Sequence, residues 1–166
     1  LLFIDYLSFA YYAYMIYGGL IFVLVILLGI GFSVKGSQRW LSLGTFSIQP
    51  SEFMKIALVL TLARFFRYNK YGIGLFDIGC VLLLTCIPMA LIIKQPDLGS
   101  ALILLPIMLA ILYAAGIGIF HLTLLIGTGV GISPLLWMFM LKPYQKMRIV
   151  GFLWPDKASE WGAGYH

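Results

Sequence analysis

Long apolar stretches separated by short polar segments make up most of the sequence. Five of them approach the roughly 20 residues that a helix needs to cross about 30 Å of lipid hydrocarbon. Their approximate ranges are 16–34, 51–66, 76–93, 98–115 and 120–141. Apolar residues follow one another within each stretch and do not alternate with polar ones, which favours helices over an outer-membrane β-barrel. The sequence therefore predicts an all-α fold, a polytopic transmembrane helical bundle, with residues 1–166 belonging to a single membrane domain.

The segments between and around these stretches have compositions of their own. Residues 1–15 are rich in tyrosine, an aromatic residue that concentrates at membrane boundaries, and we expect them to be an interfacial lead-in to the first span. Residues 35–49 are expected to form a loop, and residues 142–166 to begin another, longer one. Pro88 and Pro134 lie inside predicted spans and are expected to kink them.

Composition excludes an ordinary soluble domain. Hydrophobic residues make up 62% of the chain, charged residues 10%, and the mean hydropathy is +1.02. Without a polar surface, nucleic-acid binding is not expected, although the net charge is +5. Cys80 and Cys86 have no His or acidic partner at a metal-ligand spacing, so we interpret them as packing residues and expect no metal site from them. The chain begins at Leu1 and stops in a polar segment, and we expect it to be internal to a longer protein.

The stretch from Gly36 to Lys55 concentrates polar residues between two apolar spans. Pro50 suits the first position of a helix and Ser51 is a candidate cap. Glu52 then lies in the first turn, and Lys55 follows at i+3 on the same face, where the two can pair. We expect the pair to be partly withdrawn from water, so that removing one partner would cost roughly 3–5 kcal/mol. It is either part of a functional site or an interfacial anchor.

Five spans place most cations on one side of the membrane. That side would hold Lys35, Arg39, Lys55, Lys94, Lys142, Lys146, Arg148 and Lys157, and the other Arg64, Arg67 and Lys70. The positive-inside rule makes the first side cytoplasmic. Because successive spans cross in opposite directions, Arg39-Trp40, the Glu52/Lys55 pair and Asp97 should all lie on this same side of the membrane.

These residue types suit a phosphorylated lipid. Arg39 is suited to bidentate phosphate recognition, and is alternatively a surface anchor beside Trp40. Asp97 follows Pro96 at the start of a span, so its carboxylate either caps a helix or contacts a ligand, and the two roles are compatible. Cations there would hold a diphosphate and stabilise its departure, and an acid would take a proton.

Five motifs occur in order along the chain. They are Gly36-Ser-Gln-Arg-Trp-Leu, Gln49-Pro-Ser-Glu-Phe-Met-Lys55, Lys94-Gln-Pro-Asp-Leu-Gly99, Tyr144-Gln-Lys-Met-Arg148 and Gly162-Ala-Gly-Tyr-His166. With these motifs the chain resembles the SEDS family of bacterial cell-wall proteins, and its RodA-type members more than its FtsW-type members. The resemblance covers nearly the whole chain.

The resemblance implies a multi-pass protein of ten spans in the bacterial inner membrane. Such a protein polymerises lipid II into glycan strands by inverting glycosyl transfer, releases undecaprenyl diphosphate, and serves cell elongation and cell shape. Its partners would be a class B penicillin-binding protein (a transpeptidase), membrane proteins of the elongation complex, lipid II and membrane lipids. The family topology makes the cation-rich side external, against the positive-inside count, and residues 142–166 the start of a large extracellular loop.

The resemblance also implies roles for individual residues. Asp97 and Glu52 would support catalysis, and the substrate-binding residues would be Arg39, Trp40, Lys55, Gln95 and Arg148. The favoured general base, an Asp, would lie beyond residue 166, so we expect the chain alone to be inactive. No cofactor is fixed by the resemblance, which leaves room for a divalent cation (Mg²⁺ or Mn²⁺). The alternative functions are a lipid II flippase, which kinked spans would suit, and a scaffold that only docks partner helices.

Overall fold

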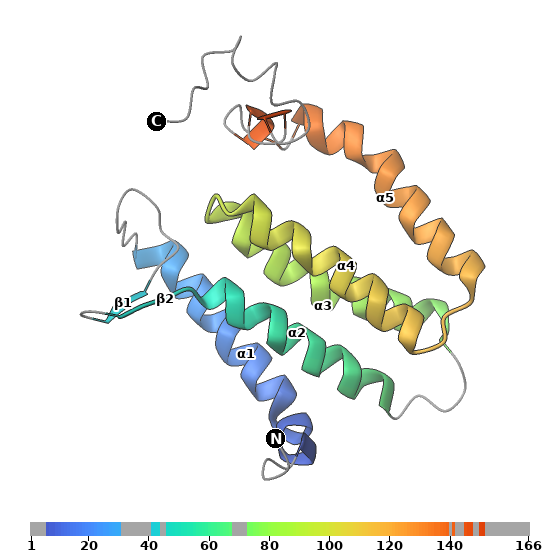
Figure 1. The fold of residues 1–166 in the computed structure, drawn as a ribbon, viewed down its shortest axis with the longest axis horizontal. Coiled ribbons are helices and arrows are strands. Elements are labelled where there is room, and N and C mark those ends of the chain that lie inside the picture. The colour runs from blue at the N-terminus through green and yellow to red at the C-terminus, as the bar shows by residue number, and fades with distance from the viewer. Residues whose placement is uncertain are drawn as a thin grey trace. The chain divides into compact units, whose positions relative to one another are not determined.

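The described part of the chain folds into helices and a short two-stranded antiparallel sheet (Figure 1). The structure, a computed structural model, describes residues 6–30, 41–43, 46–67, 73–139, 141, 145–147 and 150–151. The elements are α1 (Tyr6–Ile30), β1 (Leu41–Leu43), β2 (Phe46–Ile48), α2 (Pro50–Arg67), α3 (Leu75–Lys94), α4 (Leu98–Ala114) and α5 (Ile119–Phe139). The predicted polytopic helical fold is confirmed. The chain divides into two compact units, residues 1–119 and 120–166.

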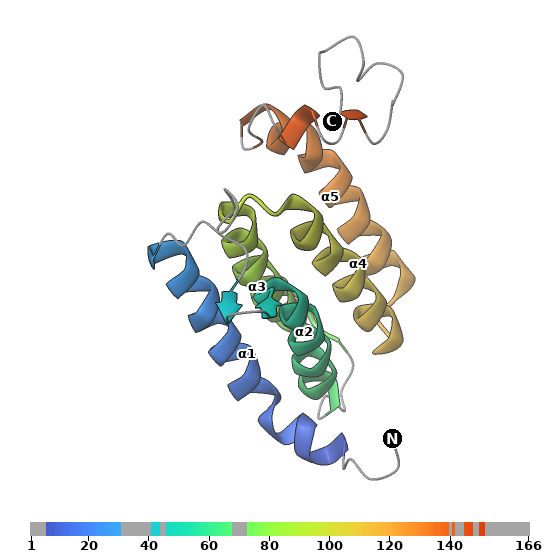
Figure 2. The ribbon, with the colours of Figure 1, turned by 60° about the vertical axis from the view of Figure 1, so that its left-hand side comes forward.

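In the first unit, α1 to α4 form an antiparallel bundle (Figures 1 and 2). Helix α2 packs on α1 and α4, and α3 packs on α4 and α1. The side chains between them are fully buried and almost all aliphatic, including Leu24, Leu27, Met54, Leu58, Leu62, Val81, Ile92, Leu104 and Leu112. Since lipid is as apolar as these side chains, close van der Waals packing holds such helices together in a membrane. The bundle thereby brings the ends of α1 and α3 beside the starts of α2 and α4.

Helix α1 begins earlier than the sequence predicted. The predicted start near residue 16 is too late, because residues 6–15 are already helical and continuous with the span. Their interfacial position stays a prediction. Ala13 and Tyr17 are buried, and the Tyr17 hydroxyl donates to the Leu84 carbonyl of α3 at 2.7 Å. Arg64 of α2 donates to the Tyr11 carbonyl. These contacts hold the tyrosine-rich segment as a helix against α2 and α3.

The predicted loop between the first two spans contains a small antiparallel sheet. Residues 41–43 pair with residues 46–48 in the register Leu41↔Ile48, Ser42↔Ser47 and Leu43↔Phe46. The sequence Leu-Ser-Leu-Gly-Thr-Phe-Ser-Ile alternates apolar and polar residues on either side of a Gly-Thr dipeptide. Such a pattern is typical of a hairpin, although each strand is only three residues long. The hairpin leads directly into α2.

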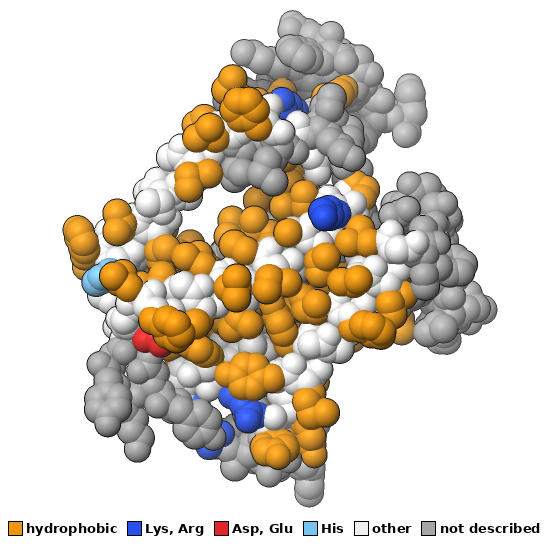
Figure 3. Space-filling view, turned by 180° about the vertical axis from the view of Figure 1, so that it is seen from behind, with side chains coloured by type: hydrophobic (Ala, Val, Ile, Leu, Met, Phe, Trp, Pro, Cys, Tyr) orange, Lys and Arg blue, Asp and Glu red, His pale blue; other side chains and the backbone are white. Residues whose placement is uncertain are grey.

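Three of the described helices are long and apolar enough to cross a membrane, at Tyr11–Gly29, Leu75–Lys94 and Ile119–Phe139. Helix α4 is apolar but has only 17 residues, and α2 carries charged side chains near both ends. The predicted crossings by α2 and α4 therefore stay predictions. Apolar side chains also cover much of the outer surface, as one face shows (Figure 3). Such a surface suits lipid better than water.

Helix α5 opens the second unit. The hydroxyls of Thr123, Thr128 and Ser133 each donate to a carbonyl of the preceding turn, at 2.9, 2.9 and 2.7 Å. These internal bonds satisfy polar groups that lipid cannot. Helices α3 and α5 both continue through their prolines, Pro88 and Pro134.

Candidate functional site at the polar end of the bundle

The residues of the second motif begin helix α2. Pro50 occupies the first helical position, where its missing N–H costs no hydrogen bond. The Gln49 carbonyl accepts from the Glu52 amide at 3.1 Å, so the chain turns into the helix at Gln49. The prediction that Ser51 caps this helix is wrong, because Ser51 lies inside the first turn. Its side chain is buried there, with 2% exposed.

Gln49 connects this helix start to a distant part of the chain. Its Nε2 group donates to Ser51 Oγ at 2.8 Å and to Asp97 Oδ2 at 2.8 Å. An amide nitrogen carries two hydrogens, and these two contacts use both. Gln49 therefore joins the start of α2 to the start of α4.

Asp97 caps helix α4. Its Oδ1 accepts from the Ser100 amide at 3.3 Å, while Oδ2 accepts from Gln49. The side chain is buried, with 8% exposed, and a carboxylate is favoured at a helix N-terminus. The capping interpretation of Asp97 is confirmed. Both carboxylate oxygens of Asp97 accept hydrogen bonds from protein groups, and these bonds stabilise the α3–α4 turn. The catalytic role of Asp97 stays a prediction.

Gln95 holds the same turn against helix α1. Its Nε2 donates to the Leu24 carbonyl at 3.0 Å, and only 2% of the residue is exposed. A carbonyl inside a helix already accepts one intrahelical bond, and its second lone pair is available to Gln95. The burial gives Gln95 a packing function, whereas its predicted contact with substrate stays a prediction.

Glu52 and Lys55 form the predicted ion pair, with Nζ and Oε2 2.7 Å apart. The burial of the pair is uneven, because the Lys55 side chain is 19% exposed and that of Glu52 is 53% exposed. Lys55 lies four residues after Ser51 and so shares its helix face. Lys55 is thus a largely covered cation whose ammonium is held by a carboxylate open to its surroundings.

We call the group Gln49, Ser51, Gln95, Asp97 and Ser100 the polar cluster, and the end of the bundle that carries it the polar end. Sequence parity predicted that the second and third motifs meet on one side, and the Gln49–Asp97 contact confirms this. The predicted substrate-binding residues Arg39, Trp40 and Arg148 lie outside the described residues.

Sequence reasoning gave no role to three members of the cluster, Gln49, Ser51 and Ser100, beyond the proposed cap. The sequence did mark Gln49 locally. It lies directly before Pro50, at the start of a helix, where its long side chain can contact another helix. Its partner Asp97 could not be predicted, because it lies 48 residues away in the sequence.

The described residues offer no group of three His, Cys, Asp or Glu side chains that could hold a metal ion. The two oxygens of Asp97 are also both engaged by protein donors. These described residues therefore do not fit a divalent cation, and the cation stays a sequence prediction.

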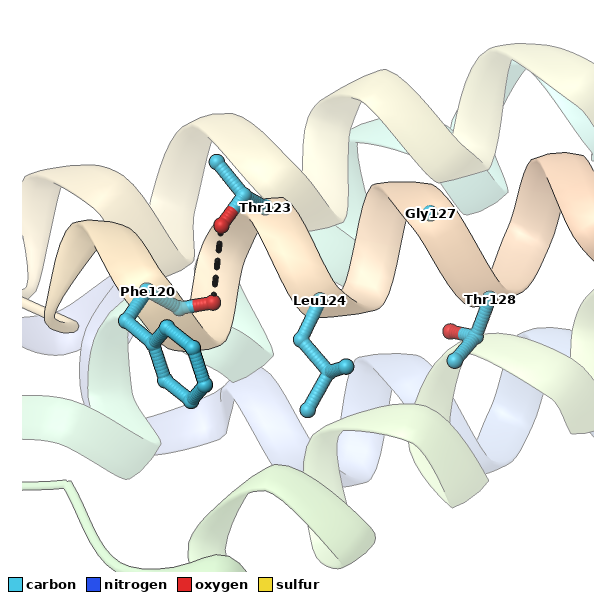
Figure 4. Close-up of a pocket in the computed structure, with 5 residues that line it drawn as sticks. All are labelled: Phe120, Thr123, Leu124, Gly127 and Thr128. Carbon is cyan, nitrogen blue, oxygen red and sulfur yellow. Dashed lines mark hydrogen bonds between the residues drawn. The ribbon is translucent and has the colours of Figure 1, made fainter.

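A shallow groove lies along helix α5 and does not share the chemistry of the polar end. It is lined by Phe120, Thr123, Leu124, Gly127 and Thr128, all from one helix face (Figure 4). The Thr123 hydroxyl bonds the Phe120 carbonyl of its own helix. With no charged lining residue, the groove is unsuited to a diphosphate, and we assign it no function.

Comparison with known proteins places the chain in a family. The FtsW/RodA/SpoVE family model, described as "Cell cycle protein", matches residues 1–166. The peptidoglycan glycosyltransferase MrdB of Escherichia coli K12 is 35% identical over 146 residues, which are 88% of this chain and 39% of that protein. Stage V sporulation protein E of Bacillus subtilis is 36% identical over 138 residues, 81% of this chain and 37% of that protein. The chain thus spans about two fifths of the length of these relatives.

Solved structures agree with this assignment. A structure described as "Structural coordination of polymerization and crosslinking by a peptidoglycan synthase complex" matches with a TM-score of 0.76 and 29% identity, covering 93% of this chain and 46% of the other. The Thermus thermophilus rod shape determining protein RodA matches with a TM-score of 0.65 and 30% identity, covering 74% of this chain and 40% of RodA. The chain belongs to the FtsW/RodA/SpoVE family, called SEDS above, and is a multi-pass chain of the bacterial inner membrane.

Proposed function

We propose that the protein to which this chain belongs is a peptidoglycan glycosyltransferase that polymerises lipid II into glycan strands. The relatives named above support the reaction class, since MrdB carries that name. The observation that carries the proposal to this chain is the Glu52–Lys55 pair at 2.7 Å, with Lys55 only 19% exposed, beside the polar cluster. A covered cation at the polar end is suited to an anionic diphosphate.

In the proposed reaction, the 4-hydroxyl of the acceptor sugar attacks the anomeric carbon of a lipid-linked donor. The bond from that carbon to the diphosphate oxygen breaks, the configuration inverts, and undecaprenyl diphosphate leaves. Lys55, with Arg39 and Arg148, would neutralise the negative charge that grows on the leaving diphosphate. One such contact, formed fully only in the transition state, contributes about 3–4 kcal/mol, by analogy with oxyanion-hole donors.

The acids would act through the cations and the fold. Glu52 would hold the Lys55 ammonium in place between turnovers. Asp97 would fix the α3–α4 turn, because its two oxygens already bind Ser100 and Gln49. The proton of the attacking hydroxyl would go to a carboxylate outside residues 1–166, so we expect the isolated chain to make no glycan.

We further propose that this protein acts in cell elongation with a class B penicillin-binding protein and other elongation-complex membrane proteins. The RodA-type motif forms support the elongation role, although the FtsW protein of Trichlorobacter lovleyi, 36% identical over 141 residues, is as similar as MrdB. The solved peptidoglycan synthase complex supports a crosslinking partner.

Purified full-length protein incubated with lipid II in detergent tests the reaction. Glycan strands separated by electrophoresis, together with released undecaprenyl diphosphate, are the expected products. Movement of labelled lipid II across vesicles without polymer would favour the flippase instead. Helices α3 and α5 continue through Pro88 and Pro134, and the kinks that would suit a flippase there stay a prediction.

A further inference from the structure

The start of α2 and the start of α4 are joined by one side chain. We propose that Gln49 is a positioning residue, which sets the placement of Lys55 relative to the α3–α4 turn by bridging Ser51 and Asp97. The inference rests on the proposed function, because it assigns Gln49 a task in that same site.

The bonding of Gln49 leaves a single orientation for its amide. Asp97 accepts and does not donate when ionised, so the nitrogen of Gln49 must face it. The same nitrogen uses its second hydrogen to donate to Ser51 Oγ, and both nitrogen–oxygen distances are 2.8 Å. Rotating the amide would place its oxygen against the carboxylate. The bridge therefore has a defined direction, from Gln49 as donor to Asp97 as acceptor.

The bridge joins groups that are themselves fixed. Asp97 is held at α4 by the Ser100 amide, and Ser51 is held by the first turn of α2. Ser51, Asp97 and Ser100 are 2%, 8% and 8% exposed. Buried polar networks in which the members are satisfied rigidify their surroundings. A shift of α2 along α4 would therefore break the hydrogen bond from Gln49 to Asp97.

Lys55 follows the bridge along the same helix face. It lies four residues, about one helical turn, after Ser51. Any rotation or sliding of the α2 start carries Lys55 with it, away from the turn that Asp97 and Gln95 hold. Gln49 thus affects the position of Lys55 without contacting it. Loss of Gln49 would displace this cation, although Gln49 itself does not contact the substrate.

A donor–acceptor exchange tests the bridge in the full-length protein. Gln49→Glu sets a carboxylate against Asp97 and should separate the two helix starts. Asp97→Asn alone should be mild, because Gln49 can turn its amide and accept from the new side chain. Gln49→Glu combined with Asp97→Asn restores a hydrogen bond in the reverse direction and keeps the total charge.

Two readouts separate positioning from bulk stability. Spin labels at Phe53 of α2 and Leu102 of α4, which are 49% and 45% exposed, report the distance between the helices. We expect one narrow distance in the parent, a broader distribution in Gln49→Glu, and a narrow one again in the exchanged pair. The kcat for lipid II should follow the same order, falling about 10²-fold in the single variant with the KM less affected.

The outcomes distinguish the bridge from the proposed function. If Gln49→Glu fails to fold, Gln49→Ala, which removes the bonds without adding charge, is measured the same way. A narrow distance and parental kcat in the Gln49 variants, or an exchanged pair that recovers neither, would overturn the bridge. If the parent makes no glycan strands, the proposed function fails, while the distance measurements still decide whether Gln49 positions α2.

Discussion

At the scale of single residues, Lys55 and Glu52 differ in solvent exposure, although their sequence spacing predicted that both would be partly withdrawn from water. Lys55 is 19% exposed and Glu52 is 53% exposed, although they form one ion pair. The prediction that removing one partner costs roughly 3–5 kcal/mol applies to buried pairs. With one partner mostly open to solvent, the pair is closer to a surface ion pair, which contributes about 0–1 kcal/mol. The expected loss of stability is therefore smaller than the sequence indicated.

Asp97 is the acid whose loss should destabilise the fold. Asp97→Ala removes a helix cap worth about 1 kcal/mol and leaves the Gln49 donor without its acceptor, at about 1–3 kcal/mol. We expect unfolding in detergent to become about 2–4 kcal/mol easier in total. Asp77→Ala is the matched control, since Asp77 accepts from the Gly74 amide at the exposed start of α3 and its loss should cost less. Equal effects of the two substitutions would contradict the account of Asp97.

Arg39 should matter more to polymerisation than another cation of the same predicted side. Arg39→Ala is expected to lower glycan synthesis strongly, because the motif resemblance assigns it to the diphosphate. Lys157→Ala is the comparison, since Asp156 and Glu160 lie near it in sequence and neutralise it. Rates of lipid II consumption at one ionic strength provide the measurement. A loss at Lys157 as large as at Arg39 would indicate that total charge, not position, governs binding.

At the scale of helices, the sequence predicted α3, α4 and α5 closely and α1 poorly. Gly, Pro and charged residues at the boundaries of an apolar run predict where the helix begins and ends, as at Gln95-Pro96-Asp97. The start of α1 has no such boundary residue, and the Arg64 side chain that contacts it at Tyr11 lies 53 residues away in the sequence. Gln49 and Asp97 present the same difficulty in the site. In both cases the sequence indicated the local role of a residue, but it did not indicate the distant residue that it contacts.

Arg64 should be the residue that anchors the tyrosine-rich part of α1. Its guanidinium lies 5.5 Å from the centroid of the Tyr11 ring and 5.1 Å from that of Tyr14. Arg64→Ala removes two cation–π contacts of about 0.5–1 kcal/mol each. Hydrogen exchange of the amides in residues 6–17 should then become roughly tenfold faster, since local opening costs less. Ile56→Ala, at a position of α2 that is 60% exposed, serves as the control and should leave that exchange unchanged.

At the scale of the whole molecule, the alternating helices decide which motifs meet. Helix α2 begins and α3 ends at the polar end, so residues 49–55 and 94–100 come together, while Arg64 and Arg67 lie at the far end of α2. This juxtaposition was predictable from the number of spans. The contacts within it were not, because they depend on the rotation of each helix about its axis.

The side of the membrane that carries the polar end is open to direct test. The positive-inside count predicts that it is cytoplasmic, whereas the motif resemblance implies that it is external, and we expect it to be external on the strength of that resemblance. Cysteines introduced at Ser37 and Ser159 of the full-length protein should react with a membrane-impermeant reagent in intact spheroplasts. Protection of both positions, with labelling after lysis, would reverse the orientation.

The central claim is that Glu52 and Lys55 act on substrate at the polar end. A double-mutant cycle of Glu52→Ala and Lys55→Ala in the full-length protein tests it, with unfolding in detergent and glycan-strand synthesis from lipid II measured for each variant. We expect each single variant to lose synthesis while its stability changes by less than about 1 kcal/mol, and the double variant to be as stable and still inactive. A double variant that synthesises glycan strands at the parental rate would remove both residues from the site.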